Sequence, residues 1–196
     1  MTFLEEYSDK EIELLISTPV RAGVWLSSAD DTGNETARYV EIRQMKNTIT
    51  RKAKVRADSE FVHEIMKMTV GCRTYWGQWY KSLDSVLDQC NDAVRLVLEK
   101  RGHQDANAYK DCIMEICNSV AGAYREFDDE AGAFARLWVG IKMRMNSIAA
   151  FITHEQYDTG ILLDVSLKED IALSKLEEAC CLADLESKED DAVLPG

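Results

Sequence analysis

The sequence predicts an all-α fold of seven to nine helices. Only 2 prolines and 10 glycines occur in 196 residues, and apolar residues recur every three or four positions, which is the spacing of one helix face. No segment shows the period-two alternation of a half-buried strand. A chain of this length can bury roughly 70% of its unfolded surface without disulfides or a structural metal. We therefore expect one helical domain over residues 1–182.

Capping signals place the first helices. Ser8 and Glu11 have the spacing of a capping box, so a short helix begins after Ser8. Thr18-Pro19 predicts that a second helix starts there, because proline is favoured in the first helical turn. A third helix begins near Asn34 and ends in a basic segment, which suits the negative end of the helix dipole.

Apolar stripes predict the next two helices. Asp58 caps a helix whose aromatic-rich face continues to Trp79, and we expect that face to lie in the core, with a ligand cradle as the alternative. The following helix ends at Gly102, a residue suited to a left-handed C-cap.

The second half of the chain opens at Asp105 with another apolar stripe, and a further stripe follows residue 132. Ser166 and Glu169 have capping-box spacing and start the last helix. The composition is strongly acidic from residue 183 onward. We expect residues 183–196 to form a disordered tail.

Two acidic turns carry the functional hypothesis. The stretch 22–35 runs from Ala-Gly through an aromatic residue to Asp30-Asp31, and a weaker copy at 121–132 reaches Asp128-Asp129. The two copies predict a quasi-symmetric bundle of two helix–acidic turn–helix repeats. The repeat units cover about residues 10–80 and 105–152.

Carboxylate oxygens bind hard cations, and several must converge because each supplies only part of the coordination shell. We expect a divalent cation to bind Asp30, Asp31, Glu35, Asp128 and Asp129; the residues do not distinguish Ca²⁺, Mg²⁺, Mn²⁺ and Zn²⁺. Helix capping is the competing explanation, since acids are favoured at helix starts. Capping explains one or two acids per turn, but two adjacent Asp side chains cannot both cap one helix.

An EF-hand loop starting at Asp30 is a second alternative. Oxygen-bearing residues fall at loop positions one, three, five, seven and twelve, the last being Glu41. Position six, which should be glycine, is Glu35. The second turn has no such match.

These acidic turns resemble those of the TerB-like helical family, which is associated with tellurite resistance and stress responses in bacteria. The fold of that family looks like two copies of one unit, which consists of a helix, an acidic Asp-Gly turn and a second helix. The carboxylates of its turns are proposed to bind a metal ion. The likeness extends over about residues 10–152. Here the Asp-Gly is displaced in the first copy, and Ala133 replaces the acid that would match Glu35. The resemblance implies a metal-binding or stress-sensing protein.

The net charge of −12 disfavours nucleic acid and anionic membranes as partners. No apolar run approaches the ~20 residues needed to cross a bilayer. With no signal peptide recognisable, we expect a cytoplasmic protein. A metal-free module that binds other proteins is the alternative function, with Trp76, Trp79 and Tyr80 as an apolar patch. The sequence leaves open whether the chain forms a homodimer.

The chain shows no Ser-His-Asp or Cys-His pairing and no nucleotide-binding loop, so we expect it not to be an enzyme. An all-α hydrolase with a carboxylate-bound metal remains a third hypothesis. Six cysteines form no Cys-x-x-Cys motif. Cys180 and Cys181 are vicinal thiols, which can hold soft metals or metalloids. Adjacent helical side chains point about 100° apart, which favours packing instead.

Overall fold

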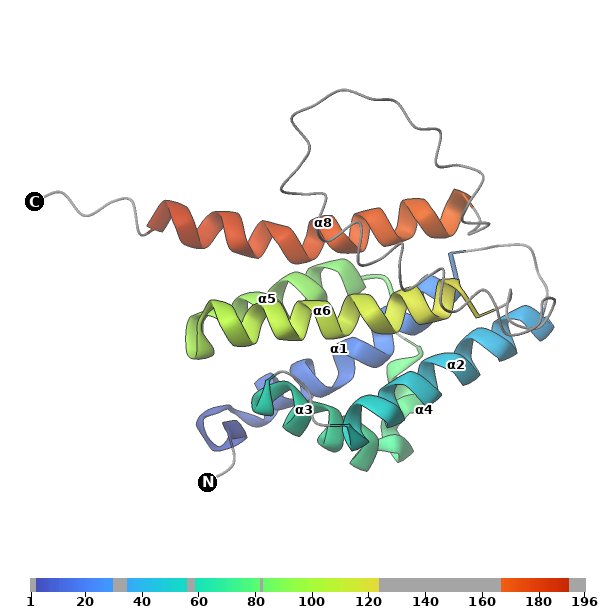
Figure 1. Ribbon diagram of the computed structural model, residues 1–196, viewed down its shortest axis with the longest axis horizontal. Helices are drawn as coiled ribbons and strands as arrows, with labels where there is room; N and C mark the ends of the chain where they lie inside the picture. Colours follow the sequence, from blue (N-terminus) through green and yellow to red (C-terminus); the bar gives the residue numbers. More distant parts are fainter. Residues whose placement is uncertain (1–2, 30–34, 56–58, 82, 124–166, 191–196) are drawn as a thin grey trace, which may run out of the picture.

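The computed structural model describes residues 3–29, 35–55, 59–81, 83–123 and 167–190 (Figure 1). Seven α-helices, two 3-10 helices and no strand form this part of the chain, which confirms the all-α prediction. In chain order the elements are η1 (Phe3–Glu6), α1 (Asp9–Ser27), α2 (Glu35–Lys54), α3 (Glu60–Gly71), η2 (Arg73–Tyr75), α4 (Trp76–Trp79), α5 (Val86–Arg101), α6 (His103–Ala121) and α8 (Leu167–Asp190).

Helix α1 is the centre of the bundle. It contacts each of the six other α-helices. Helices α5 and α6 lie on one side of it with α8 packed against them, and α2, α3 and α4 lie on the other side (Figure 1). The apolar side chains of α1 are accordingly buried over most of its length.

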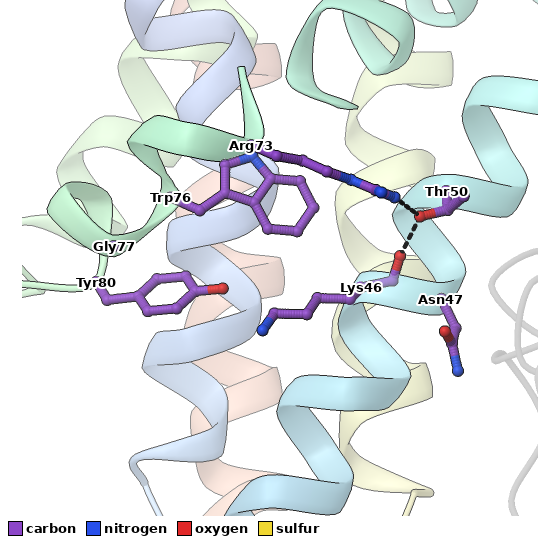
Figure 2. A pocket seen from close by; sticks show the side chains of 7 residues that line it. All are labelled: Lys46, Asn47, Thr50, Arg73, Trp76, Gly77 and Tyr80. Carbon is purple, nitrogen blue, oxygen red and sulfur yellow. Dashed lines mark hydrogen bonds between the residues drawn. The ribbon is translucent and has the colours of Figure 1, made fainter. Parts of the chain in front are cut away.

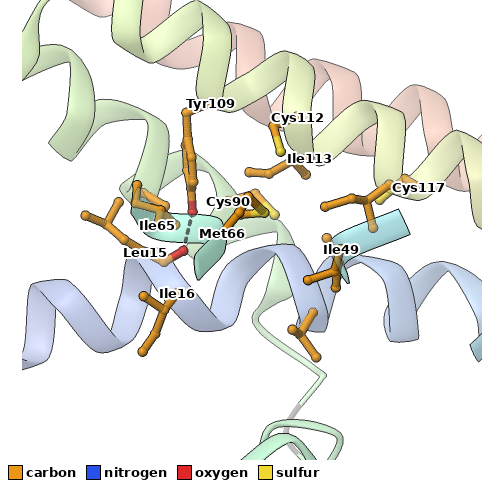
Figure 3. Close-up of a cluster of buried hydrophobic side chains, with 14 of the residues drawn as sticks. Leu15, Ile16, Ile49, Ile65, Met66, Cys90, Tyr109, Cys112, Ile113 and Cys117 are labelled. Carbon is orange, nitrogen blue, oxygen red and sulfur yellow. Dashed lines mark hydrogen bonds between the residues drawn. The ribbon is translucent and has the colours of Figure 1, made fainter. Parts of the chain in front are cut away.

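Helix α1 runs unbroken through Pro19, so the predicted start of a new helix at Thr18 is wrong. A proline inside a helix lacks the N–H that would bind the carbonyl four residues earlier, and its ring crowds that carbonyl. Here the affected carbonyl belongs to Leu15. The buried Tyr109 hydroxyl of α6 donates a 2.7 Å hydrogen bond to it (Figure 3). Burial raises the pKa of Tyr109 well above its usual value, so the hydroxyl stays protonated.

A second buried hydroxyl binds α1 from the opposite side. The Thr69 side chain of α3 lies 2.9 Å from the Ile16 carbonyl and 2.9 Å from the Ile65 carbonyl. Within α1, the Thr18 hydroxyl donates a 2.7 Å hydrogen bond to the Leu14 carbonyl. The Leu14 and Leu15 carbonyls therefore each have a side-chain donor, and the Ile16 carbonyl shares the single Thr69 hydroxyl hydrogen with Ile65, which offsets the disruption of the helical ladder.

Gly23 of α1 lies directly against the Met45 side chain of α2. A Cβ atom at this position would lie 2.6 Å from the Met45 sulfur and 3.5 Å from a methyl carbon of Ile116. Only glycine leaves room for these two side chains, because protein interiors pack without spare volume. The Ala-Gly pair of the first turn motif is therefore a packing feature.

The segment after α2 departs from the predicted single long helix. Ser59, rather than Asp58, is the N-cap of α3 and accepts a hydrogen bond from the Val62 N–H. The helix ends at Gly71, a residue of low helix propensity. The chain then turns inward through η2 and α4, so the aromatic residues do not continue one helical face.

The last helix is longer than predicted, because α8 continues to Asp190 and includes most of the expected disordered tail. Its Ala, Leu, Glu and Lys residues are strong helix formers. Residues 191–196 lie outside the described part. At Gly102, between α5 and α6, φ is positive at 82°, but ψ is 178°, so the residue does not adopt the predicted left-handed C-cap.

The predicted repeat is only partly visible. Residues 124–152 of the second copy lie outside the described part of the chain. The two Ala-Gly pairs occupy different positions, since Ala22-Gly23 lies inside α1 whereas Ala121 is the last residue of α6. The quasi-symmetry therefore stays a prediction.

The start of α1 forms the predicted capping box. The Glu11 carboxylate accepts a 2.7 Å hydrogen bond from the Ser8 N–H, and the Ser8 side chain caps the Glu11 N–H. Lys100 of α5 adds a 2.8 Å ion pair to Glu11. The hydrogen bond from Lys100, followed by those from Ser8, lowers the pKa of Glu11 to about 2.

Replacing Tyr109 with Phe should destabilise the protein by about 1–3 kcal/mol, because it leaves the buried Leu15 carbonyl without a partner. In a Pro19→Ala background the new N–H of residue 19 can bind that carbonyl, so the same substitution should cost less. Urea unfolding of the four proteins measures the coupling. An equal cost in both backgrounds would show that the hydroxyl does not compensate for the proline.

Glu11→Gln should flatten the acid side of the stability profile. The pKa of Glu11 is lower in the folded state than in the unfolded state, so its contribution is present above about pH 4.5 and is lost as the pH falls toward 2. Urea unfolding between pH 5 and pH 2.5 measures this loss. Glu13→Gln, an exposed site on the same helix, is the matched control. The assignment fails if both variants show the same profile.

Candidate functional site

A polar pocket of about 530 Å³ opens between α2 and the segment formed by η2 and α4 (Figure 2). This volume falls within the roughly 300–1,000 Å³ of typical small-molecule sites. The lining residues are Lys46, Asn47, Thr50, Arg73, Trp76, Gly77 and Tyr80.

Helical spacing places these side chains on a common opening. Lys46 and Thr50 are four residues apart on α2 and so lie on one face of that helix. Trp76 and Tyr80 have the same spacing across α4. Helix α3 packs directly on α2, and the turn after Gly71 then places Arg73 and Trp76 beside the α2 residues that line the pocket.

Thr50 organises the cationic side of the pocket. Its hydroxyl donates a 2.6 Å hydrogen bond to the Lys46 carbonyl and accepts one from the Arg73 guanidinium (Figure 2). The Arg73 Cζ lies 5.7 Å from the centre of the Trp76 ring, within range of a cation–π interaction. The Trp76 indole N–H is itself fixed by a 3.0 Å hydrogen bond to the Thr69 carbonyl. Arg73 is therefore held on two sides.

Tyr80 supplies a buried donor. Its hydroxyl oxygen is buried and has no hydrogen-bond partner among the described residues. Burial raises the pKa of Tyr80, so the hydroxyl remains protonated. Figure 2 shows this hydroxyl and the Lys46 ammonium pointing toward each other across the pocket. Because the Tyr80 oxygen is closed off from solvent, an acceptor atom meets both donors only after the Lys46 side chain moves aside.

The pocket is positive within a strongly acidic protein. Among the described residues, no carboxylate lines it or forms an ion pair with Lys46 or Arg73. Some other cations of the bundle form internal ion pairs, as Arg51 and Lys52 do with Glu115 and Lys100 does with Glu11. The charges of Lys46 and Arg73 are therefore available to an external anion.

The sequence-predicted metal site lies mostly outside the described residues, which exclude Asp30, Asp31, Asp128 and Asp129. Glu35 is the first residue of α2 and is exposed. Within the described ranges no group of three or more His, Cys, Asp or Glu side chains could hold a metal ion. The metal site stays a prediction.

The structure corrects the EF-hand alternative. Helix α2 already begins at Glu35, so the backbone is helical from the sixth of the twelve loop positions onward. That helix cannot also provide the extended ligand loop of an EF-hand.

The predicted apolar patch is also wrong for two of its three residues. Trp76 and Trp79 are each only 4% exposed, because α4 turns both rings into the core. Only Tyr80 remains partly exposed, and it faces the pocket. The indole rings therefore cannot form an external docking surface.

The cysteine packing interpretation fits the structure. Cys180 is buried and its thiol contacts that of Cys90 on α5, whereas Cys181 accepts a 3.1 Å hydrogen bond from Lys110 on α6. The two vicinal thiols thus face different helices. The hydrogen bond with Cys180, followed by burial, raises the pKa of Cys90 well above its usual value, which makes its thiolate inaccessible at neutral pH.

The pocket and its two cations, Lys46 and Arg73, were not predicted from the sequence. Lys46 and Arg73 are 27 positions apart, and no motif links them. The available local signal was Lys46-x-x-x-Thr50 on one helix face, with Arg73 three residues before Trp76. That spacing indicates a common pocket only when the end of α3 at Gly71 and the turn after it are known.

No protein-family model, curated protein or solved structure matches the chain. The likeness to the TerB-like family therefore stays a resemblance of short motifs. Among the helices of the described ranges, none combines the length and apolar character required to cross a membrane.

Proposed function

We propose that the chain is a non-catalytic binding protein whose pocket between α2 and α4 holds a small anion. The observation that carries this proposal is the convergence of Lys46, Arg73 and the Tyr80 hydroxyl on one pocket that no carboxylate of the described residues lines. A protein of net charge −12 repels anions in general, so a local positive pocket is needed to select one.

The hydrogen-bonding inventory favours an acceptor-rich ligand. Lys46 offers three N–H donors, Arg73 keeps donors beyond the one used on Thr50, and Tyr80 offers an O–H. The Thr50 hydrogen is already given to a backbone carbonyl. Among the lining side chains only the Asn47 amide oxygen is a spare strong acceptor. Within the described ranges no thiol, carboxylate or imidazole lines the pocket to serve as nucleophile or base, which favours binding over catalysis.

Lys46→Gln should weaken the binding of inorganic phosphate at least tenfold, because a hydrogen bond to a charged group contributes about 1.5–3 kcal/mol. Titration calorimetry at low ionic strength measures the dissociation constant. Arg73→Lys should also weaken binding, since an ammonium cannot reproduce the planar, multi-donor contact of a guanidinium.

Lys67→Gln is the matched control, because it removes the same charge from an exposed position on α3. Its affinity should stay within twofold of the parent. An equal loss in Lys46→Gln and Lys67→Gln would reduce the interaction to diffuse electrostatics and overturn the proposal.

Metal binding in a TerB-like stress-sensing role is a second candidate, supported by the doubled acids Asp30-Asp31 and Asp128-Asp129. A specific cation at 100 times its dissociation constant should stabilise the fold by about 2.7 kcal/mol. Thermal unfolding with Ca²⁺, Mg²⁺, Mn²⁺ or Zn²⁺ measures this shift.

The shift should disappear in Asp30→Asn/Asp128→Asn. It should persist in Asp84→Asn/Asp88→Asn, which makes the same charge change at exposed positions near and within α5. If no cation shifts the transition, or if both double variants respond alike, the acidic turns are not a metal site.

A further inference from the structure

We infer that the anion bound between α2 and α4 is a phosphate monoester, an inference that rests on the proposed anion site. Donors approach the pocket from two sides, with Lys46 on α2 and with Arg73 and Tyr80 on the opposite segment. A phosphate monoester presents three terminal oxygens in different directions and close to two negative charges at neutral pH. A carboxylate presents two coplanar oxygens and one charge, so it satisfies this arrangement less completely.

The size of the pocket favours an ester over a free ion. Its volume of about 530 Å³ is many times the ~30 Å³ occupied by one water molecule, so an inorganic ion would fill only a small part of it. The remaining wall includes Trp76, Gly77 and Tyr80. Gly77 is exposed and a Cβ atom there would meet nothing within 4 Å, so this side of the pocket is open to solvent and can admit an organic group.

Tyr80 allows binding to be separated from folding. Its buried hydroxyl has no partner among the described residues, so removing it takes no hydrogen bond away from that part of the fold. Leaving a buried hydroxyl unpaired is unfavourable, and Tyr80→Phe should therefore keep or raise the stability of the free protein. The same substitution should weaken phosphate-ester binding about tenfold, because the ester loses a charge-assisted hydrogen bond.

The ligand's own ionisation gives a second signature. The second pKa of a phosphate monoester is about 6, so the dianion predominates at pH 7.5 and the monoanion at pH 5. Of the residues that the structure describes, the charged or titratable side chains lining the pocket are Lys46, Arg73 and Tyr80, and none of the lining residues is a carboxylate or a histidine. Ester binding should therefore weaken severalfold from pH 7.5 to pH 5. A carboxylate ligand, with a pKa near 4, should change little over that range.

The test compares phenyl phosphate, benzoate and inorganic phosphate by titration calorimetry with the full chain at pH 7.5 and pH 5. We expect phenyl phosphate to bind at least tenfold more tightly than either other probe, and to lose affinity at pH 5. Gly77→Met, which extends a side chain into the open space, should weaken phenyl phosphate more than inorganic phosphate. Urea unfolding of the variants checks that each remains folded.

The outcomes separate the two proposals. If benzoate binds as tightly as phenyl phosphate and both depend on Lys46, the anion site stands and the ester inference is wrong. If inorganic phosphate matches phenyl phosphate, the organic group makes no contact and the ester inference is also wrong. If none of the probes binds, or if binding is indifferent to Lys46→Gln, both the ester inference and the anion-binding function are overturned.

Discussion

The hydrogen bond from the Tyr109 hydroxyl to the Leu15 carbonyl is the interaction on which the rest of the structure depends. It allows α1 to continue through Pro19, and α1 is the helix that contacts every other α-helix described. A break at Pro19 would redirect the second half of α1, including Gly23, against which Met45 of α2 packs. The position of α2, and hence one wall of the pocket, follows from an unbroken α1.

A chain of contacts links this core to the pocket. The Thr69 hydroxyl lies against the Ile16 carbonyl of α1, while the Thr69 carbonyl accepts the Trp76 indole N–H. Trp76 in turn lies under the guanidinium of Arg73, which donates to Thr50 of α2. Buried hydrogen bonds therefore fix the Trp76 ring beneath Arg73, whereas the Arg73 bond to Thr50 and the Lys46 side chain are exposed.

The elements that could be predicted from the sequence are those set by local chemistry. The capping box at Ser8 and Glu11 and the end of a helix at Gly102 depend on a few adjacent residues and are confirmed. Helix faces such as that of α6 follow from spacing alone. The effect of Pro19 could not be predicted, because its compensating donor lies 90 residues away.

The pocket was hidden for a similar physical reason. The aromatic stripe after Ser59 has regular helical spacing, yet α3 ends at Gly71 and the following turns reverse the chain. Lys46 and Arg73 line the same pocket only because of this reversal. The doubled acids, by contrast, stand out in the sequence but lie largely outside the described residues, so their role rests on sequence alone.

The most direct test of the account is an amide and indole NMR titration of the full chain with phenyl phosphate. The account predicts that chemical-shift changes concentrate on residues 46–50 and 73–80, including the Trp76 indole N–H, and saturate with a single dissociation constant. Chemical-shift changes confined to Arg38 and Arg43, the exposed arginines in the first half of α2, would contradict it, as would the absence of any saturable change.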